Sequence, residues 1–283
     1  MLAVVGDLVE DIVVWPVAAP RRGTDTAARI ERRRGGSAAN VAVFAAALGS
    51  ATRFIGCVGD DAIGAVLVGE LAAAGVDPCV QHRGRTGTIV VLVAPDGERT
   101  MLPDRGACTE LTDGPGSWLD GVRWLHVPAY SLMGEPLGTT TRSLVARARR
   151  LGVPVSVDAS SVGGLTVYGV ERFGAWLGAV VPDVLLANED EAARLRVGHH
   201  AGPAAGLTVV KQGADPVRLW RGATLVAEVP VPPVTEVRDT TGAGDAFAAG
   251  FLTATLDGAD AVTAAAVGSS VAGRVLGNPG AAL

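Results

Sequence analysis

Short apolar runs rich in β-branched residues recur along the chain, separated by segments rich in Ala, Leu and Arg with helical spacing. Such runs, when a glycine or a polar residue ends them, are typical of buried parallel strands. They are LAVVG at the start, then RFIGCVG, WLHVPAY, VPVSVDAS, DVLLAN and LTVVKQG. Because alternating strands and helices form a parallel sheet covered on both faces, the sequence predicts a three-layer α/β/α sandwich with a mostly parallel central sheet.

Two regions, approximately residues 12–34 and 86–104, interrupt this alternation with strand-like residues and turns. The stretch GTIVVLVAPDGERTMLP predicts a β-hairpin around Asp96-Gly97. We expect the two regions to form a small β-sheet beside the main one, suited to act as a lid. No linker, internal repeat or low-complexity tract divides the chain, so residues 1–283 are expected to form a single domain.

The composition of the 283 residues, 48% hydrophobic and 19% charged, is that of a globular protein. Lys and Arg number 24 against 29 Asp and Glu, a formal charge of -5, so we expect no nucleic-acid partner. The basic run RIERRR at residues 29–34 is the main exception, and we interpret it as a solvated loop or strand edge.

The cysteines and the N-terminus exclude other classes. Cys57, Cys79 and Cys108 show no CxxC spacing, which argues against a disulfide framework and a zinc site. The start MLAVVGDLVEDIVV lacks a basic n-region, and no run of about 18 apolar residues suggests a membrane span. We therefore expect a cytoplasmic protein without a membrane partner.

A glycine-rich helix start is the first candidate site. In DTTGAGDAFAAGF, residues 239–251, Phe247 and Phe251 lie i and i+4, which predicts a helix that begins about Gly244. The first turn of a helix carries unpaired N–H groups and a partial positive charge, and glycines clear the way for an anion such as phosphate. Asp245 in this turn either complements the helix dipole or deprotonates an attacking hydroxyl, and the motif alone favours neither role.

The stretch GGSAAN is the second candidate site. Gly35 and Gly36 would let a polyol approach the backbone, and Asn40 at the head of the next helix would bind its hydroxyls; a simple turn and helix start is the alternative. Asp7 and Asp11 follow the first strand, where ligands bind in open α/β sheets. For Asp7 a role as strand-ending cap or turn residue is an equal alternative.

The stretch ANEDE is the third. Asn188 and Glu191 are three residues apart after a predicted strand, so they share a helical face. They could hold a hydrated Mg²⁺ that screens nucleotide phosphates. A capping box, with Asn188 as N-cap and Glu191 at the third position, is the strong alternative.

Together and in this order, these stretches resemble the ribokinase-like family of carbohydrate kinases, also called the PfkB family. The resemblance covers nearly the whole chain. It rests on GDLVED, GGSAANVA, FIGCVGDDAIGAVLVGELAAAGVD, ANEDE, VVKQGA and DTTGAGDAF, of which the last is the most specific. It implies a sandwich of about nine strands with a β-lid, ATP as phosphoryl donor and Mg²⁺ as helper.

The resemblance also implies residue roles. It makes Asp245 the catalytic base and assigns the anion hole for the transferred phosphoryl group to Gly242, Ala243 and Gly244. It assigns the Mg²⁺-phosphate motif to Asn188 and Glu191, with Glu191 acting on Mg²⁺ through water, and nucleotide contacts to Lys211 and Gly213. It assigns the sugar contacts to Asp11, Gly35, Gly36 and Asn40, and in some members a monovalent cation such as K⁺ to Asp239 and Thr241.

Two departures concern the nucleotide side. Pro216 stands where the family commonly has a glycine after KQGA, which puts that turn in doubt. The chain also ends at NPGAAL, soon after a glycine-alanine pair that usually precedes further structure.

The sequence therefore predicts an ATP-dependent kinase that phosphorylates a hydroxyl of a sugar or a sugar-containing small molecule. The alternatives are a nucleoside kinase of the adenosine type and a non-catalytic sugar or nucleotide sensor on the same fold. Family analogy also suggests a homodimer through the β-lid. No G-x-x-x-x-G-K-[ST] or G-x-S-x-G occurs, and no G-x-G-x-x-G follows the first strand, which disfavours P-loop kinases, hydrolases with a nucleophile elbow and dinucleotide dehydrogenases.

Overall fold

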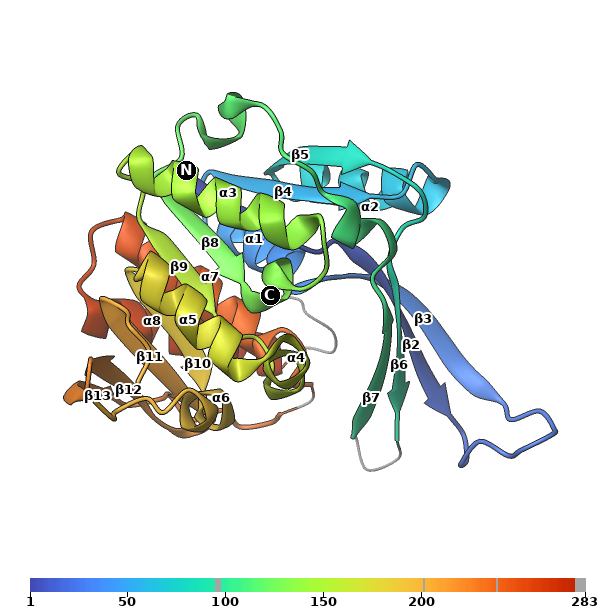
Figure 1. Cartoon of the computed structure of the whole chain (residues 1–283). Helices are drawn as coiled ribbons and strands as arrows, with labels where there is room; N and C mark the ends of the chain where they lie inside the picture. Colours follow the sequence, from blue (N-terminus) through green and yellow to red (C-terminus); the bar gives the residue numbers. More distant parts are fainter. Residues whose placement is uncertain (95–97, 201, 238, 278–283) are drawn as a thin grey trace.

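The computed structural model describes residues 1–94, 98–200, 202–237 and 239–277. The expected hairpin turn around Asp96-Gly97 and the NPGAAL end lie outside these ranges. Within them the chain forms a large sheet between two layers of helices, and a small sheet that projects from one side (Figure 1).

The large sheet has nine strands in the order β13-β12-β11-β10-β9-β8-β1-β4-β5. The strands from β11 to β5 pair in parallel, and β12 and β13 add an antiparallel edge. The predicted, mostly parallel sandwich is thus confirmed. The strands are β1 (Leu2–Val5), β4 (Thr52–Val58), β5 (Val76–His82), β8 (Trp124–Pro128), β9 (Val155–Asp158), β10 (Val184–Asn188), β11 (Leu207–Gln212), β12 (Asp215–Arg221) and β13 (Thr224–Val229).

The six predicted strand runs all form strands of this sheet, whereas β5, β12 and β13 were not predicted. β5 carries Pro78 and lies at one edge, where a missing N–H is tolerated. β12 and β13 form a hairpin at the other edge. The buried central strands therefore carried the stronger sequence signal.

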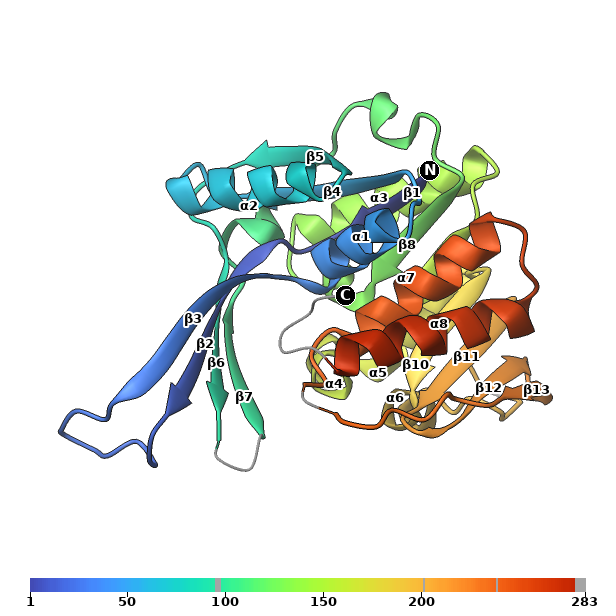
Figure 2. The same cartoon turned by 180° about the vertical axis from the view of Figure 1, so that it is seen from behind.

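Helices cover both faces of the sheet. In β1 all four residues are fully buried; Leu2 and Val4 belong to one core cluster, and Ala3 and Val5 belong to the other. The first core lies under α1 (Ser37–Ala47), α2 (Ala62–Ala73), α7 (Ala243–Leu256) and α8 (Ala261–Leu276), seen in Figure 2. The second lies under α3 (Leu137–Arg150), α4 (Val162–Tyr168), α5 (Val170–Val180) and α6 (Glu189–Arg194). None of the helices in the described ranges is long and apolar enough to cross a membrane.

The small sheet has four strands in the order β3-β2-β6-β7. Only β2 and β6 pair in parallel. The strands are β2 (Val9–Pro16), β3 (Ala28–Gly35), β6 (Thr88–Val93) and β7 (Arg99–Asp104). The expectation of a second, small sheet is confirmed, and its base adjoins the carboxyl end of β1 (Figures 1 and 2).

Helix α7 places the glycine-rich turn, and its packing on α8 depends on two bare positions. A Cβ at Gly268 would lie 2.9 Å from the carbonyl oxygen of Phe247 and 3.1 Å from its ring. A Cβ at Gly250 would lie 3.0 Å from the Cα of Gly268. The two helices therefore approach each other more closely than any larger residue would permit.

We predict that Gly268→Ala lowers the free energy of unfolding by about 1–3 kcal/mol, because the methyl group overpacks this contact. Gly69→Ala in α2 is the matched control, since nothing lies within 4 Å of its Cβ position. There the better helix propensity of Ala should raise stability by about 0.5–1 kcal/mol. Denaturant titration measures both, and equal stabilisation by the two substitutions would contradict the close packing.

Candidate active site

The α7 N-terminus forms as the sequence predicts, one residue earlier than expected. Gly242 is the N-cap with φ 75°, and α7 begins at Ala243. This left-handed backbone is one that glycine adopts without strain. Ala246 donates its N–H to the carbonyl oxygen of Gly242 at 2.8 Å, so Asp245 lies in the first turn. The turn presents backbone N–H groups and the positive end of the helix dipole.

The carboxylate of Asp245 is held by two side chains from the start of α1. Ser37 Oγ donates to Asp245 Oδ1 at 2.6 Å, and Asn40 Nδ2 donates to Oδ2 at 3.0 Å. Each Asp245 oxygen thus has a defined donor, which fixes the orientation of the carboxylate. Ser37 was missed by the sequence analysis, although it stands between the glycine pair and Asn40 in GGSAAN.

Burial raises the pKa of Asp245 to about 6, against the hydrogen bonds from Ser37 and Asn40, which lower it. The nearby Asp158 raises this pKa further, and Lys211 lowers it. Burial likewise raises the pKa of Asp11 to about 6, and the neighbouring Arg34 and Arg33 oppose this effect. A carboxylate whose pKa lies this close to neutrality is ionised at pH 7 and still accepts a proton readily.

The expected sugar-binding residues surround Asp245. Asp11 lies in β2, within electrostatic range of Asp245. A Cβ at Gly35 would overlap the carboxylate of Asp11. Gly36 has φ 101°, and a Cβ there would overlap the carbonyl oxygen of Asp7. The glycine pair therefore serves close packing of the protein itself.

Two oxygens at this site are buried without a hydrogen-bond partner among the described residues, Asp11 Oδ1 and Asn40 Oδ1. A buried acceptor without a donor is unfavourable by about 1–3 kcal/mol. Hydroxyl groups of a ligand are suitable donors, so the two orphan oxygens are consistent with a polyol site.

A lysine lies beside the glycine-rich turn. Lys211 Nζ donates to Asp158 Oδ2 at 2.9 Å, and it lies 3.5 Å from the position that a Cβ on Gly244 would occupy. Burial lowers the pKa of Lys211, but Asp158 and Glu191 more than offset it, so the pKa is raised and the ammonium stays charged. Lys211 was expected to contact the nucleotide, whereas its partner Asp158 was not predicted.

Asn188 and Glu191 form the capping box that was the alternative interpretation. Asn188 N–H and Nδ2 donate to the two Glu191 oxygens at 2.8 and 3.0 Å, and Glu191 N–H donates to Asn188 Oδ1 at 2.8 Å. Burial and then Asp158 raise the pKa of Glu191 to about 7, against the effects of Lys211 and the Asn188 N–H. The capping box places the Glu191 carboxylate near Asp158 and Lys211.

The implied Mg²⁺ suits the charges here. Carboxylate oxygens are the ligands that Mg²⁺ prefers, and Asp158, Glu191 and Asp245 interact electrostatically with the single ammonium of Lys211. The described residues contain no ready-made cluster of three metal-binding side chains. Mg²⁺ usually binds through one or two carboxylates together with water and substrate phosphates, so these residues fit it.

Other expected residues lie in defined places. Asp7 forms a bidentate ion pair with Arg105 at 2.7 and 2.8 Å, which supports its structural interpretation. Gly213, with φ 61°, lies in the turn between β11 and β12, and Pro216 lies in β12 where the register of the β11–β12 pairing shifts. Thr241 N–H donates to Asp239 Oδ1 at 2.7 Å, and Arg99 forms an ion pair with the same oxygen.

The interpretation of RIERRR as a solvated edge is wrong for its last residue. Arg34 is half-buried at the end of β3 and interacts electrostatically with Glu70, Asp11 and Asp245; burial lowers its pKa. No local pattern distinguishes Arg34 from its exposed neighbour Arg32, which pairs with Glu10 at 2.9 Å. The strand register places both arginines on one face of the small sheet, and Arg34 differs in its neighbours, Glu70 of α2, Asp11 and Asp245.

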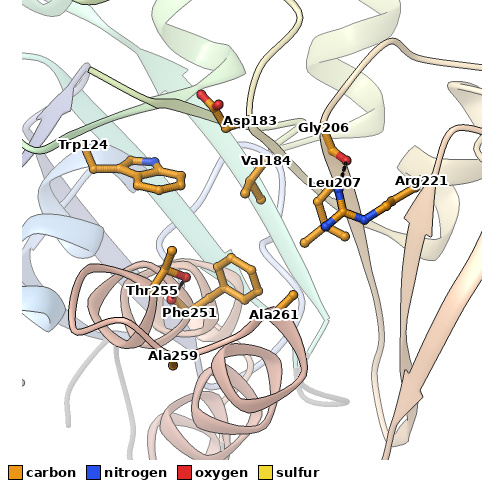
Figure 3. Close-up of a pocket in the computed structure, with 10 residues that line it drawn as sticks. All are labelled: Trp124, Asp183, Val184, Gly206, Leu207, Arg221, Phe251, Thr255, Ala259 and Ala261. Carbon is orange, nitrogen blue, oxygen red and sulfur yellow. Dashed lines mark hydrogen bonds between the residues drawn. The ribbon is translucent and has the colours of Figure 1, made fainter. Parts of the chain in front are cut away.

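Two cavities lie beside the C-terminal helices α7 and α8. One of about 500 Å³ lies between residues 232–236 and α8, where it is lined by Ser269, Ser270, Gly273, Arg274 and Gly277. The segment that lines it leads directly into the glycine-rich turn. The other, of about 280 Å³, lies at the amino ends of β8, β10 and β11, against Trp124, Val184, Leu207 and Phe251 (Figure 3). Ligands of open α/β sheets bind at the carboxyl ends of the strands, and the first cavity begins three residues after the carboxyl end of β13.

The family model of the pfkB family carbohydrate kinases matches residues 1–283. A fructokinase of Klebsiella pneumoniae is 32% identical over 88% of this chain and 82% of its own length. An ATP-dependent ribose-1-phosphate kinase of Halopiger xanaduensis is 32% identical over 90% of this chain and 86% of its own.

Solved structures agree in fold. Adenosine kinase from Sinorhizobium meliloti has a TM-score of 0.87 at 23% identity and covers 100% of this chain and 95% of its own. A sugar kinase from Pyrococcus horikoshii, solved with ATP, has a TM-score of 0.84 at 25% identity over 99% and 94%. The fold and the matches define an ATP-dependent carbohydrate kinase. The chain belongs to the PfkB family.

The raised pKa of Asp245 predicts a pH-dependent stability. In the unfolded chain Asp245 loses its proton near the ordinary aspartate pKa of 3.8, whereas in the folded protein it keeps the proton up to about pH 6. Between these values the unfolded state binds fewer protons, so the contribution of Asp245 to the free energy of unfolding falls as pH rises, and it is constant above.

We therefore expect the stability of Asp245→Asn relative to the wild type to rise between about pH 4 and 6 and then level off, by on the order of 1.4 kcal/mol per unit of pKa shift. Asp11 and Glu191 are present in both proteins, and because the Asp245 charge raises the pKa of Asp11, its removal adds a change of the same sign. Denaturant titration over this pH range measures it, and a difference independent of pH would show that the Asp245 pKa is not raised.

Proposed function

We propose that this kinase transfers the γ-phosphoryl group of ATP to a hydroxyl of a sugar or a sugar-containing small molecule, with Asp245 as general base. The observation that carries the proposal is the Asp245 carboxylate, oriented by Ser37 and Asn40 within the glycine-rich first turn of α7. We further propose that residues 1–283 act as one unit in which the small sheet is the lid.

In this mechanism the substrate hydroxyl lies between Asp245 and the γ-phosphorus. As its oxygen bonds to phosphorus, its proton passes to Asp245, and the bond from phosphorus to the ADP oxygen breaks. The pKa of about 6 lets the carboxylate take this proton and return it to water at neutral pH.

Negative charge on the phosphoryl group is met by groups already in place. Backbone N–H groups of Gly242, Ala243 and Gly244 surround the first turn, and the Lys211 ammonium lies beside Gly244. Mg²⁺, held with water by Glu191 and Asp158, would screen the phosphates of the nucleotide. The cavity between residues 232–236 and α8 would take the adenosine.

The sugar would be recognised by Asp11 and Asn40, whose orphan oxygens accept its hydroxyls. Arg34, which interacts electrostatically with Glu70, Asp11 and Asp245, adds a positive charge near this side of the site. Such a charge favours a substrate that carries an acidic or phosphate group over a neutral nucleoside.

We predict that Asp245→Asn keeps ATP binding but loses roughly 10²- to 10⁴-fold in kcat, the range for removal of a general base. The wild-type kcat/KM should fall below about pH 6 as Asp245 becomes protonated. ATP consumption is measured across a panel of sugars, sugar phosphates and nucleosides.

The matched control is Asp257→Asn at the other end of α7, where the side chain is exposed. Near-normal turnover by Asp245→Asn would exclude it as the base. Binding of panel compounds without any ATP consumption would favour the non-catalytic sensor.

We also propose a homodimer through the small sheet. On the face opposite to Asp11, the strand register brings together the apolar side chains of Ile12, Ile30, Val14, Val90, Leu92 and Leu102. Ile30 is 60% and Leu102 54% exposed, so a second copy would find an apolar surface here.

We expect Leu102→Asp to shift the protein from dimer to monomer in sedimentation velocity at micromolar concentration. Leu225→Asp is the control, since Leu225 is also exposed, at 41%, but lies in β13. A wild type that sediments as a monomer would contradict the proposal.

A further inference from the structure

The turn that precedes the anion hole is tied to the small sheet through one carboxylate. Asp239 Oδ1 accepts the N–H of Thr241 at 2.7 Å and forms an ion pair with the Arg99 guanidinium. The Asp239 side chain is 9% and the Arg99 side chain 21% exposed. The pair is therefore largely shielded from water, where opposite charges attract more strongly than at the surface.

Arg99 reaches Asp239 because of the strand register. In the small sheet Asp11 pairs with Ile89, Ile89 with Pro103, and side chains alternate between the faces. Counting back by twos from Pro103 places Arg99 on the same face as Asp11. One face of the small sheet thus presents Asp11 near Asp245 and Arg99 to the turn that leads into Gly242–Gly244.

This arrangement disagrees with the monovalent cation that the family resemblance implied for Asp239 and Thr241. A bound K⁺ would need the Asp239 carboxylate as a ligand. Here Asp239 Oδ1 already has an N–H donor and a guanidinium, whose positive charge is permanent. The Arg99 guanidinium offsets the charge of the Asp239 carboxylate, so this pair does not fit a metal cation, unlike the three carboxylates around the single ammonium of Lys211.

We propose that Arg99 takes the place of a monovalent cation: its guanidinium holds Asp239 and, through it, the turn that carries the anion hole, so that the enzyme does not depend on K⁺. Arg99 acts through Asp239 and is a positioning residue. Because Arg99 belongs to the small sheet, it holds the anion hole in place only when that sheet lies over the site. The catalytic consequence rests on the proposed function, whereas the replacement of the cation does not.

The first experiment needs no activity. Melting temperatures of the wild type and Arg99→Ala are compared in KCl and in tetramethylammonium chloride, each at about 0.1 M. We expect the wild type to melt at the same temperature in both salts. Arg99→Ala, which removes the guanidinium from beside the Asp239 carboxylate, should melt higher in KCl, because K⁺ then binds the folded state.

A wild type that KCl stabilises above tetramethylammonium would overturn the proposal, and so would an Arg99→Ala variant that does not distinguish the salts. Arg85→Ala is the matched control. Arg85 lies in the loop before β6 and pairs with Asp104 of β7, both 62% exposed, and its loss should leave the salt response of the wild type unchanged.

The second experiment measures kcat/KM with a substrate from the panel. Wild-type activity should be equal in the two salts. The kcat/KM of Arg99→Ala should fall on the order of 10²-fold in tetramethylammonium, the effect expected when catalytic groups are misplaced, and it should recover in KCl. Arg99→Lys, which keeps the charge, should retain most of the activity.

The positioning role would be overturned if Arg99→Ala were as active as the wild type, or if the wild type required K⁺. If the wild type phosphorylates no compound of the panel, the proposed function fails. In that case the melting experiment still decides whether Arg99 replaces the cation.

Discussion

Two hydrogen bonds between the first turns of α1 and α7 hold the site together. Asp245, in the first turn of α7, accepts hydrogen bonds from Ser37 and Asn40 in the first turns of α1. Both helices lie on the same face of the sheet, and α7 packs on α8 through bare glycine positions. The geometry of the candidate site thus depends on the packing of three helices, since a shift of either first turn would break a hydrogen bond to the carboxylate.

The site is balanced between negative charges that are costly to bury and the few cations near them. Burial raises the pKa values of Asp11, Glu191 and Asp245 toward neutrality. Lys211 and Arg34 offset only part of this charge. Under the proposed function, Mg²⁺ would add positive charge beside these carboxylates, and the nucleotide phosphates would lie at the positive end of α7.

Most of the fold followed from local pattern. The central strands are apolar on both faces, which distinguishes them in sequence. Pro78 made β5 unlike a typical strand, and the β12–β13 hairpin follows the KQGA stretch, which was interpreted only for its nucleotide contacts. At the site, glycine and acid in one helix turn signalled Asp245. Ser37, Asp158 and Arg34 carried no such signal, because an isolated serine, aspartate or arginine has many surface roles.

The sequence by itself determined the α/β sandwich, the glycine-rich helix start and the capping box, because each depends on residues close together in the chain. Only the tertiary structure decided which distant charges meet. Asp245 lies 208 residues from Ser37, and Lys211 lies 53 from Asp158. It also decided that Asp239 meets an arginine of the small sheet. Such pairs depend on strand order and register, which place side chains together irrespective of their distance along the chain.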